Sequence, residues 1–99
     1  MKEYYIKHEN FLRGYFTIWR GTLEHLINDV FGYTLDCGNS WDNKINKNPK
    51  TGKSLVNNLN RSASATRRYN DYYELLTREQ YNEYNEKEDF SQSKTIYKR

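Results

Sequence analysis

Two short segments near the start of the chain have the alternating pattern of β-strands. Residues 3–7 (EYYIK) and 14–19 (GYFTIW) are rich in aromatic and β-branched side chains, which favour strands. In the second segment both alternating sets of side chains are largely apolar, which indicates a strand inside a sheet rather than at its edge. We predict that the two strands form a hairpin connected by residues 8–13.

The following segment has the spacing of an amphipathic helix. Its apolar side chains recur at intervals of three and four residues and therefore share one face. They are Leu23, Leu26, Ile27, Val30 and Phe31, preceded by Thr22 as a predicted N-cap. The pattern leaves two possible ends. Either the helix stops at Gly32 and residues 33–37 form a strand, or it continues to Gly38, because a glycine inside a helix costs only about 1 kcal/mol. We favour the longer helix, and the strand remains the alternative.

Residues 39–50 are polar and include the only proline of the chain, so we predict a loop. Trp41 and Ile45 are its large apolar side chains, and we expect them to anchor it to the core. A helix from about Thr51 to about Arg68 follows, with apolar positions that can face the core.

The last part of the chain is predicted to contain one strand and one helix. Residues 72–76 (YYELL) have the composition of a short strand, and Thr77 and Gln80 have the spacing of a capping box at a helix start. We expect residues 91–99 to form a mobile basic tail. The whole pattern predicts a small single α+β domain over residues 1–90, with an N-terminal β-hairpin or short sheet packed against two to three helices.

Composition indicates a folded domain and argues against a membrane protein. The chain of 99 residues contains ten tyrosines and two tryptophans, which bury large areas, and its net charge of +3 is too small to force expansion. No apolar run approaches the roughly 18 residues of a membrane span, and the first residues lack the apolar segment of a signal peptide. The single cysteine permits no internal disulfide, so we expect a reducing cytoplasm.

The tripeptide Gly-Lys-Ser at residues 52–54 is how a nucleotide-binding phosphate loop ends. The full motif needs a glycine where this chain has Lys47, and Pro49 removes a backbone donor from the loop. We therefore predict no nucleotide hydrolysis. A helix start flanked by Lys50 and Lys53 is still a generic anion site, and two solvated lysines are the alternative interpretation.

No other group of residues has the spacing of a catalytic or metal site. His8, His25 and Cys37 lack metal-ligand spacing, and Cys37 falls on the apolar stripe of the longer helix, which predicts a small buried residue. Residues 13–19 (RGYFTIW) begin like an RNA-recognition strand, but the match stops after Tyr15, so core packing is the better interpretation. We expect no enzyme activity, no metal and no cofactor.

Charge is distributed unevenly along the second half of the chain. Residues 41–70 contain seven basic side chains against one acid, and residues 71–92 contain seven acids against two basic side chains. Either the two segments neutralise each other, or the basic one meets a partner. Aromatic and basic side chains together are typical of protein interfaces and of single-stranded nucleic-acid sites. The predicted contact residues are Lys44, Lys47, Lys50, Lys53, Arg61, Arg67, Arg68, Tyr69, Tyr72 and Tyr73.

Four stretches together resemble small uncharacterised proteins of phages and mobile elements in AT-rich Gram-positive bacteria. They are FGYTLDCGNSW, KINKNPKT, SLVNNLNRS and YYELL, within residues 31–76. Such elements encode short inhibitors of host defence, including anti-CRISPR proteins, and the resemblance implies a stoichiometric binder of a nucleic-acid enzyme. It carries no site residues over to this chain.

We therefore predict a non-catalytic phage or mobile-element protein in the bacterial cytoplasm. It would bind and inhibit a host nucleic-acid-processing defence complex, a protein or ribonucleoprotein. Direct nucleic-acid binding through residues 44–73 is the first alternative, and a phage structural or assembly subunit is the second. The sequence does not indicate the oligomeric state.

Overall fold

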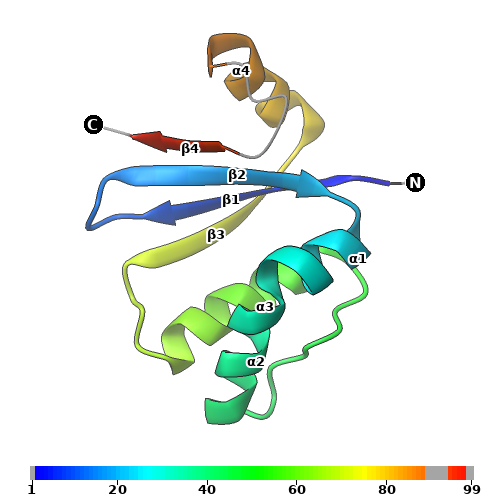
Figure 1. The fold of residues 1–99 in the computed structure, drawn as a ribbon, viewed down its shortest axis with the longest axis vertical. Coiled ribbons are helices and arrows are strands. Elements are labelled where there is room, and N and C mark those ends of the chain that lie inside the picture. The colour runs from blue at the N-terminus through cyan, green and yellow to red at the C-terminus, as the bar shows by residue number, and fades with distance from the viewer. Residues whose placement is uncertain (1, 89–93, 98–99) are drawn as a thin grey trace.

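The computed structural model describes residues 2–88 and 94–97, with side chains described for residues 2–14 and 16–84. These residues form an α+β fold around one antiparallel sheet (Figure 1), which confirms the predicted fold class. The strands lie in the order β3-β1-β2-β4, with β1 at Tyr4–Asn10, β2 at Tyr15–Gly21, β3 at Asp71–Leu76 and β4 at Lys94–Tyr97. The helices are α1 (Leu23–His25), α2 (Gly32–Trp41), α3 (Gly52–Ala65) and α4 (Arg78–Glu88), with a π-helical segment η1 (Leu26–Phe31) before α2.

The sheet has helices on both faces. Figure 1 shows α1, α2 and α3 below the sheet and α4 above it. Successive side chains of a strand point to opposite faces. Tyr5 of β1 therefore packs towards α4, and its neighbour Ile6 packs towards α3. The largely apolar character of both faces of β2 has the same cause, and β2 is an internal strand between β1 and β4, as predicted.

Two apolar clusters hold the layers together. The larger one joins the sheet to η1, α2 and α3, and contains Ile6, Leu26, Phe31, Leu35, Ile45, Leu55, Val56, Leu59 and Tyr73. The smaller one joins the sheet to α4, and contains Tyr5, Phe16, Ile18, Leu76 and Tyr81. In the smaller cluster the rings of Tyr5 and Tyr81 are stacked with centroids 4.4 Å apart. The tyrosines thus supply much of the core that the few aliphatic residues cannot fill.

The longer helix is confirmed and the strand over residues 33–37 is wrong. The Thr22 side chain caps its start by accepting a hydrogen bond from the His25 amide at 3.2 Å. Helical structure then continues through the wider turns of η1 and through Gly32 to Trp41. A Cβ at Gly32 would lie 2.7 Å from the Ile27 carbonyl oxygen, so glycine permits this wider turn. Leu35 is fully buried in the larger cluster, so this helix packs one face against the core.

The segment after this helix matches the prediction only in part. Ile45 is buried at 2% exposure and anchors the loop, but Trp41 is the last helical residue and is 77% exposed. The predicted loop start, Asn39, is still helical, because α2 continues two residues further to Trp41. Trp41 therefore belongs to the outer face of α2 and does not anchor the loop. The next helix, α3, begins after a Thr51 cap as predicted and ends at Ala65, three residues before Arg68.

The end of the chain differs from the expected tail where it is described. Residues 94–97 form β4 and pair with residues 15–18 of β2; the other residues of the predicted tail lie outside the described residues. The strand and capping box predicted before it are confirmed: the Thr77 amide donates to Gln80 Oε1 at 2.8 Å and the Gln80 amide donates to Thr77 Oγ1 at 3.1 Å. No helix in the described part of the chain is long and apolar enough to cross a membrane.

Candidate partner-binding surface

Four of the predicted basic contact residues lie at the two ends of α3. This helix has 14 residues, so at 1.5 Å per residue it is roughly 20 Å long. Lys50 and Lys53 flank its start, and Arg67 and Arg68 follow its end. The structure therefore does not bring these four cations together into one site.

Two of the predicted cations are already paired with acids. Arg61 Nε lies 2.6 Å from Asp42 Oδ2, and Lys47 Nζ lies 3.8 Å from Asp36. The Arg61 guanidinium, together with the Lys44 backbone amide, lowers the pKa of the Asp42 carboxyl. Both acids come from α2 or the residue after it, whereas α4 lies across the sheet from α3 (Figure 1). Among the described side chains, no ion pair joins the acidic segment, residues 71–92, to the basic segment, residues 41–70; the side chains of residues 85–92 lie outside the described part of the chain.

Tyr73 is a core residue and not a contact residue. It is 4% exposed, its ring stacks on His8 at 4.3 Å, and it meets Phe31 edge-on at 5.8 Å. Burial, and then the charge of Asp71, raises its pKa to about 12. The neighbouring Tyr72 is 45% exposed because successive strand residues face opposite sides. A sequence of two adjacent tyrosines does not indicate which one is buried.

Arg67 has an unusual backbone conformation at the end of α3. Its φ is 61°, in the left-handed region, and it is the one non-glycine residue described with a positive φ. The Arg67 amide donates to Ser64 O at 3.1 Å, and the Arg68 amide donates to Ala63 O at 2.7 Å. These are the two hydrogen bonds of a Schellman helix end, in which this position is usually glycine.

Exposed rings surround this helix end. Tyr69 is 70% exposed, and Arg68, Tyr69 and Tyr72 line a shallow hollow together. The ring of Tyr72 stacks with Phe11, whose centroid is 6.2 Å away. Phe11 belongs to the β1–β2 loop, and its amide donates to Asn70 O at 2.9 Å, which attaches the loop to the chain entering β3.

The sequence reasoning missed Phe11 and its neighbour Leu12, which are 58% and 78% exposed. A signal was present. Two large apolar residues in the turn of a hairpin cannot reach either face of the sheet. Gly14 closes this turn with a φ of 72° and a hydrogen bond from its amide to Asn10 O at 3.0 Å.

The outer face of α2 adds two further rings. Tyr33 and Trp41 are 78% and 77% exposed and lie eight residues apart on the helix, with the half-buried Cys37 midway between them. Cys37 is thus not the fully buried residue predicted, because the buried face of α2 is defined by Leu35 and Gly38. A hydrogen bond with Cys37 raises the pKa of Tyr33, and the charge of Arg68 opposes that shift.

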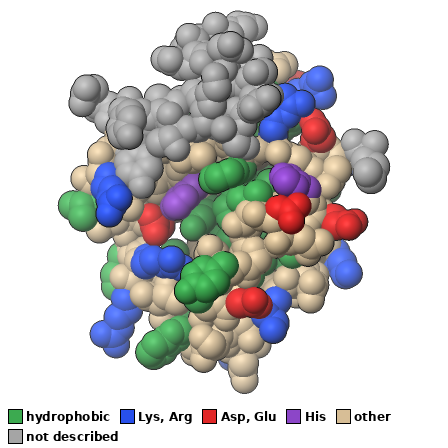
Figure 2. Space-filling view, viewed as in Figure 1, with side chains coloured by type: hydrophobic (Ala, Val, Ile, Leu, Met, Phe, Trp, Pro, Cys, Tyr) green, Lys and Arg blue, Asp and Glu red, His purple; other side chains and the backbone are tan. Residues whose placement is uncertain are grey.

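We call this set of exposed side chains the aromatic–basic surface. It consists of Phe11, Leu12, Tyr33, Trp41, Arg67, Arg68, Tyr69 and Tyr72. Figure 2 shows hydrophobic side chains exposed beside Lys and Arg side chains over the lower half of one face of the molecule. No ion pair involves Arg67 or Arg68 within the described part of the chain.

Comparison with known proteins adds nothing to this geometry. No family model, curated protein or solved structure matches the chain.

Proposed function

We propose that the protein is a non-catalytic binding protein that inhibits a host nucleic-acid-processing complex. The observation that carries the proposal is the aromatic–basic surface. Tyr, Trp and Arg are the side chains that most often dominate binding energy at protein interfaces. Here they are exposed without a described ion pair at Arg67 or Arg68. Scattered apolar side chains are normal on a protein surface, but rings gathered around unpaired arginines favour a partner.

The backbone of Arg67 supports the same surface. A left-handed conformation costs an L-residue roughly 1–2 kcal/mol, and glycine would adopt it freely. The exposed guanidinium makes no described ion pair that would compensate for this cost. Local strain of this kind is concentrated where a side chain is needed for function.

The class of partner rests on the resemblance to small proteins of phages and mobile elements. Proteins of that kind include stoichiometric inhibitors of host defence, which supports a cytoplasmic protein or ribonucleoprotein of a nucleic-acid enzyme as the target. In that proposal the aromatic–basic surface occupies a channel or interface that the enzyme needs for its own nucleic acid.

Direct binding of single-stranded nucleic acid is the second candidate. It is favoured by the exposed rings of Tyr69 and Tyr72 in one hollow with Arg68. Such sites combine rings that stack on bases with cations that meet phosphates. A phage structural subunit remains the third class, and no feature of the surface favours it specifically.

A pull-down from host lysate, read by mass spectrometry, tests the first candidate. The wild-type protein should retain a nuclease or its guide complex. Arg67→Glu combined with Arg68→Glu should lose that partner at unchanged thermal stability. Lys50→Glu combined with Lys53→Glu is the matched control, because it makes the same charge change at the other end of α3. Recovery of capsid or tail proteins alone would contradict the proposal and favour an assembly subunit.

Fluorescence anisotropy with a labelled single-stranded oligonucleotide tests the second candidate. Binding should fall steeply as salt rises from roughly 50 to 200 mM, because phosphate contacts release counterions. No binding at the lower concentration would eliminate direct recognition while leaving the protein-partner proposal intact.

A further inference from the structure

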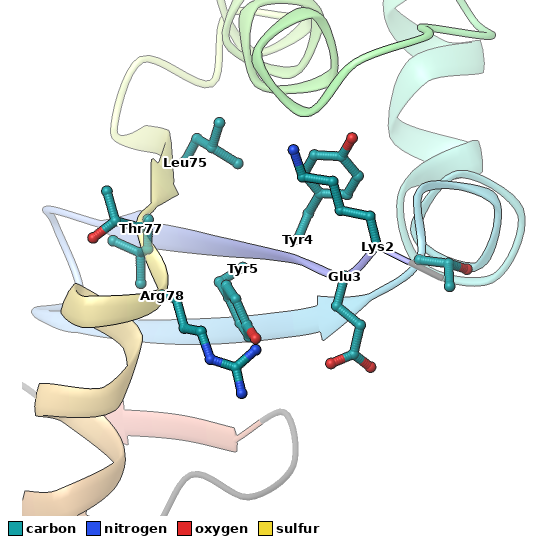
Figure 3. Close-up of a pocket in the computed structure, with 9 residues that line it drawn as sticks. Lys2, Glu3, Tyr4, Tyr5, Leu75, Thr77 and Arg78 are labelled. Atoms are coloured by element: carbon teal, nitrogen blue, oxygen red, sulfur yellow. The ribbon is translucent and has the colours of Figure 1, made fainter.

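A pocket at the opposite end of the sheet is independent of the aromatic–basic surface. It has a volume of about 720 Å³ and lies where β1 begins and β3 ends. Its lining combines the tyrosine rings of Tyr4 and Tyr5 with Leu75 and the charged side chains of Lys2 and Arg78. Figure 3 shows Lys2, Tyr4 and Leu75 on one side of β1, and Glu3, Tyr5 and Arg78 on the other.

At this pocket the sheet lacks a strand beside the start of β1. The ladder between β1 and β3 ends with the pair Tyr5–Leu76, and the chain then turns into α4. On the other side of β1, pairing with β2 continues one residue further, from Tyr4 to Gly21. The beginning of β1 thus has a partner strand on one side only.

Backbone groups face this gap. The amide and carbonyl of Tyr73 are directed away from β1, because both bond to Asn60. Since hydrogen-bonding direction alternates along an antiparallel strand, Leu76 is directed towards Tyr5. Continuing this alternation, the backbone of Glu3, directly before β1, is directed to the same side. Among the described residues, no backbone hydrogen bond uses the Glu3 amide or carbonyl.

The charges around the gap are not balanced. Glu3 is neutralised by Arg20, whose guanidinium lies 3.3 Å from its carboxylate. Neither Lys2 nor Arg78 forms an ion pair within the described residues; Lys2 Nζ lies 5.2 Å from the centre of the Tyr4 ring. Within the described part of the chain, the gap therefore has one cation without an ion pair on each face of the sheet.

We propose that this gap binds a short, extended acidic segment of a partner protein as an added strand. The segment would pair with the free edge at Glu3, in the manner of β-strand addition. Because side chains of a strand alternate between faces, carboxylates at adjacent positions would reach Lys2 on one face and Arg78 on the other. One flanking apolar side chain would lie on the Lys2 face and contact Tyr4 and Leu75, the latter being 36% exposed, and the other would lie on the face of Tyr5.

Nuclear magnetic resonance titration tests this proposal with a defined probe. The probe is an acetylated tetrapeptide amide with two adjacent glutamates between leucines. We expect it to shift the amide signals of residues 2–5 and 76–78. Arg78→Gln should lower the affinity for the peptide roughly tenfold, as for the loss of a charged hydrogen bond. Arg13→Gln is the matched control, because this exposed arginine lies in the β1–β2 loop outside the pocket lining, and it should leave the affinity unchanged.

Two further titrations of the folded wild-type protein test which chemical group of the ligand is recognised. The same peptide with glutamine in place of glutamate should bind at least tenfold more weakly, and inorganic phosphate should not reproduce the shifts. Equal binding of the two peptides, or phosphate binding that matches the acidic peptide, would overturn the proposal. A dimer that Arg78→Gln dissolves would assign the gap to a second copy of the chain and overturn it equally.

Discussion

At the scale of single residues, the structure contains one arginine whose backbone conformation opposes stability. Arg67 occupies the left-handed position of a Schellman helix end, with a φ of 61°. Its neighbours fix this conformation through two backbone hydrogen bonds from the amides of Arg67 and Arg68. The conformation is therefore set by the end of α3, and the side chain adds nothing to it.

Replacing this arginine should separate stability from binding. We expect Arg67→Gly to raise the free energy of unfolding by roughly 1 kcal/mol, because glycine adopts positive φ without a Cβ penalty. Urea unfolding measures the change. Arg68→Gly is the control at a residue without positive φ and should give no gain. In the pull-down, Arg67→Gly should retain less partner than the wild type, and a variant that is more stable and binds equally well would argue against a functional reason for Arg67.

The buried Tyr73 should lower the stability of the fold at alkaline pH. Its pKa in the folded protein is raised to about 12 from 10.0, chiefly by burial. Below pH 10 the phenol is neutral in the folded and the unfolded chain and makes no differential contribution. Between pH 10 and pH 12 the unfolded chain ionises first, so stability falls as pH rises, by roughly 2–3 kcal/mol for a shift of this size.

The variant Tyr73→Phe should remove this part of the pH dependence. Unfolding free energies measured by denaturant from about pH 9 to pH 12 should fall less steeply for Tyr73→Phe than for the wild type. Tyr69→Phe, at a tyrosine that is 70% exposed, should follow the wild-type curve. Identical slopes for all three proteins would show that the Tyr73 hydroxyl is solvated in the folded state.

At the scale of elements, β3 is an edge strand whose free side is covered. The Asn60 side chain in α3 accepts from the Tyr73 amide at 2.8 Å and donates to the Tyr73 carbonyl at 2.9 Å. The Asp71 amide donates to Arg68 O at 3.1 Å. Unpaired strand edges promote pairing with other chains, and these contacts leave little of β3 available. The same clamp joins α3 to the sheet.

Loss of the two hydrogen bonds between Asn60 and Tyr73 should lower stability more than is usual for a polar residue on a helix. Asn60→Ala removes both hydrogen bonds and leaves two backbone groups of Tyr73 without partners. We expect a loss of roughly 2–6 kcal/mol in the free energy of unfolding, at 1–3 kcal/mol for each of the two groups. Asn57→Ala, at an exposed position of the same helix, should change stability by less than about 0.5 kcal/mol. Alanine is the better helix former, so propensity alone would stabilise both variants. A loss at Asn60 no larger than the change at Asn57 would show that the two hydrogen bonds of Asn60 contribute little to stability.

At the scale of the whole molecule, two surfaces with unpaired cations lie at different ends of the fold. The aromatic–basic surface collects residues from the β1–β2 loop, α2 and the chain after α3. The gap that we propose to bind an acidic peptide is lined by residues from the start of β1 and the start of α4. The lining residues of the gap include no member of the aromatic–basic surface.

The two surfaces should therefore act independently. Arg67→Glu with Arg68→Glu should abolish partner capture and change the affinity for the acidic peptide by less than about twofold, since distant sites without shared contacts are additive. Arg78→Gln should do the reverse. Both properties can be measured on the same protein preparations. Loss of both properties in one variant, at unchanged thermal stability, would indicate a single continuous interface.

Local pattern determined most of the elements. The spacing of apolar residues identified the two strands of the hairpin, the helix over 22–38 and α3, because periodicities of 2 and 3.6 follow from backbone geometry alone. Thr22, Thr51 and the capping box at Thr77 marked helix starts correctly, since a cap acts within one turn. The turn of η1 was not predicted, because it depends on how Leu26 and Phe31 reach a shared core.

Only the tertiary structure decided which of the candidate residues meet. The sequence places Tyr72 and Tyr73 side by side, but the pleat and the packing of α3 bury Tyr73 and expose Tyr72. It separates Lys2 from Arg78 by most of the chain, and the antiparallel order β3-β1-β2 brings them to one gap. Charge counts gave the composition of the basic segment, while the structure showed that Asp36 of α2 pairs with Lys47 and that Asp42, directly after α2, pairs with Arg61. Periodicity is a property of neighbouring residues, whereas exposure and charge balance depend on which distant segments pack against them.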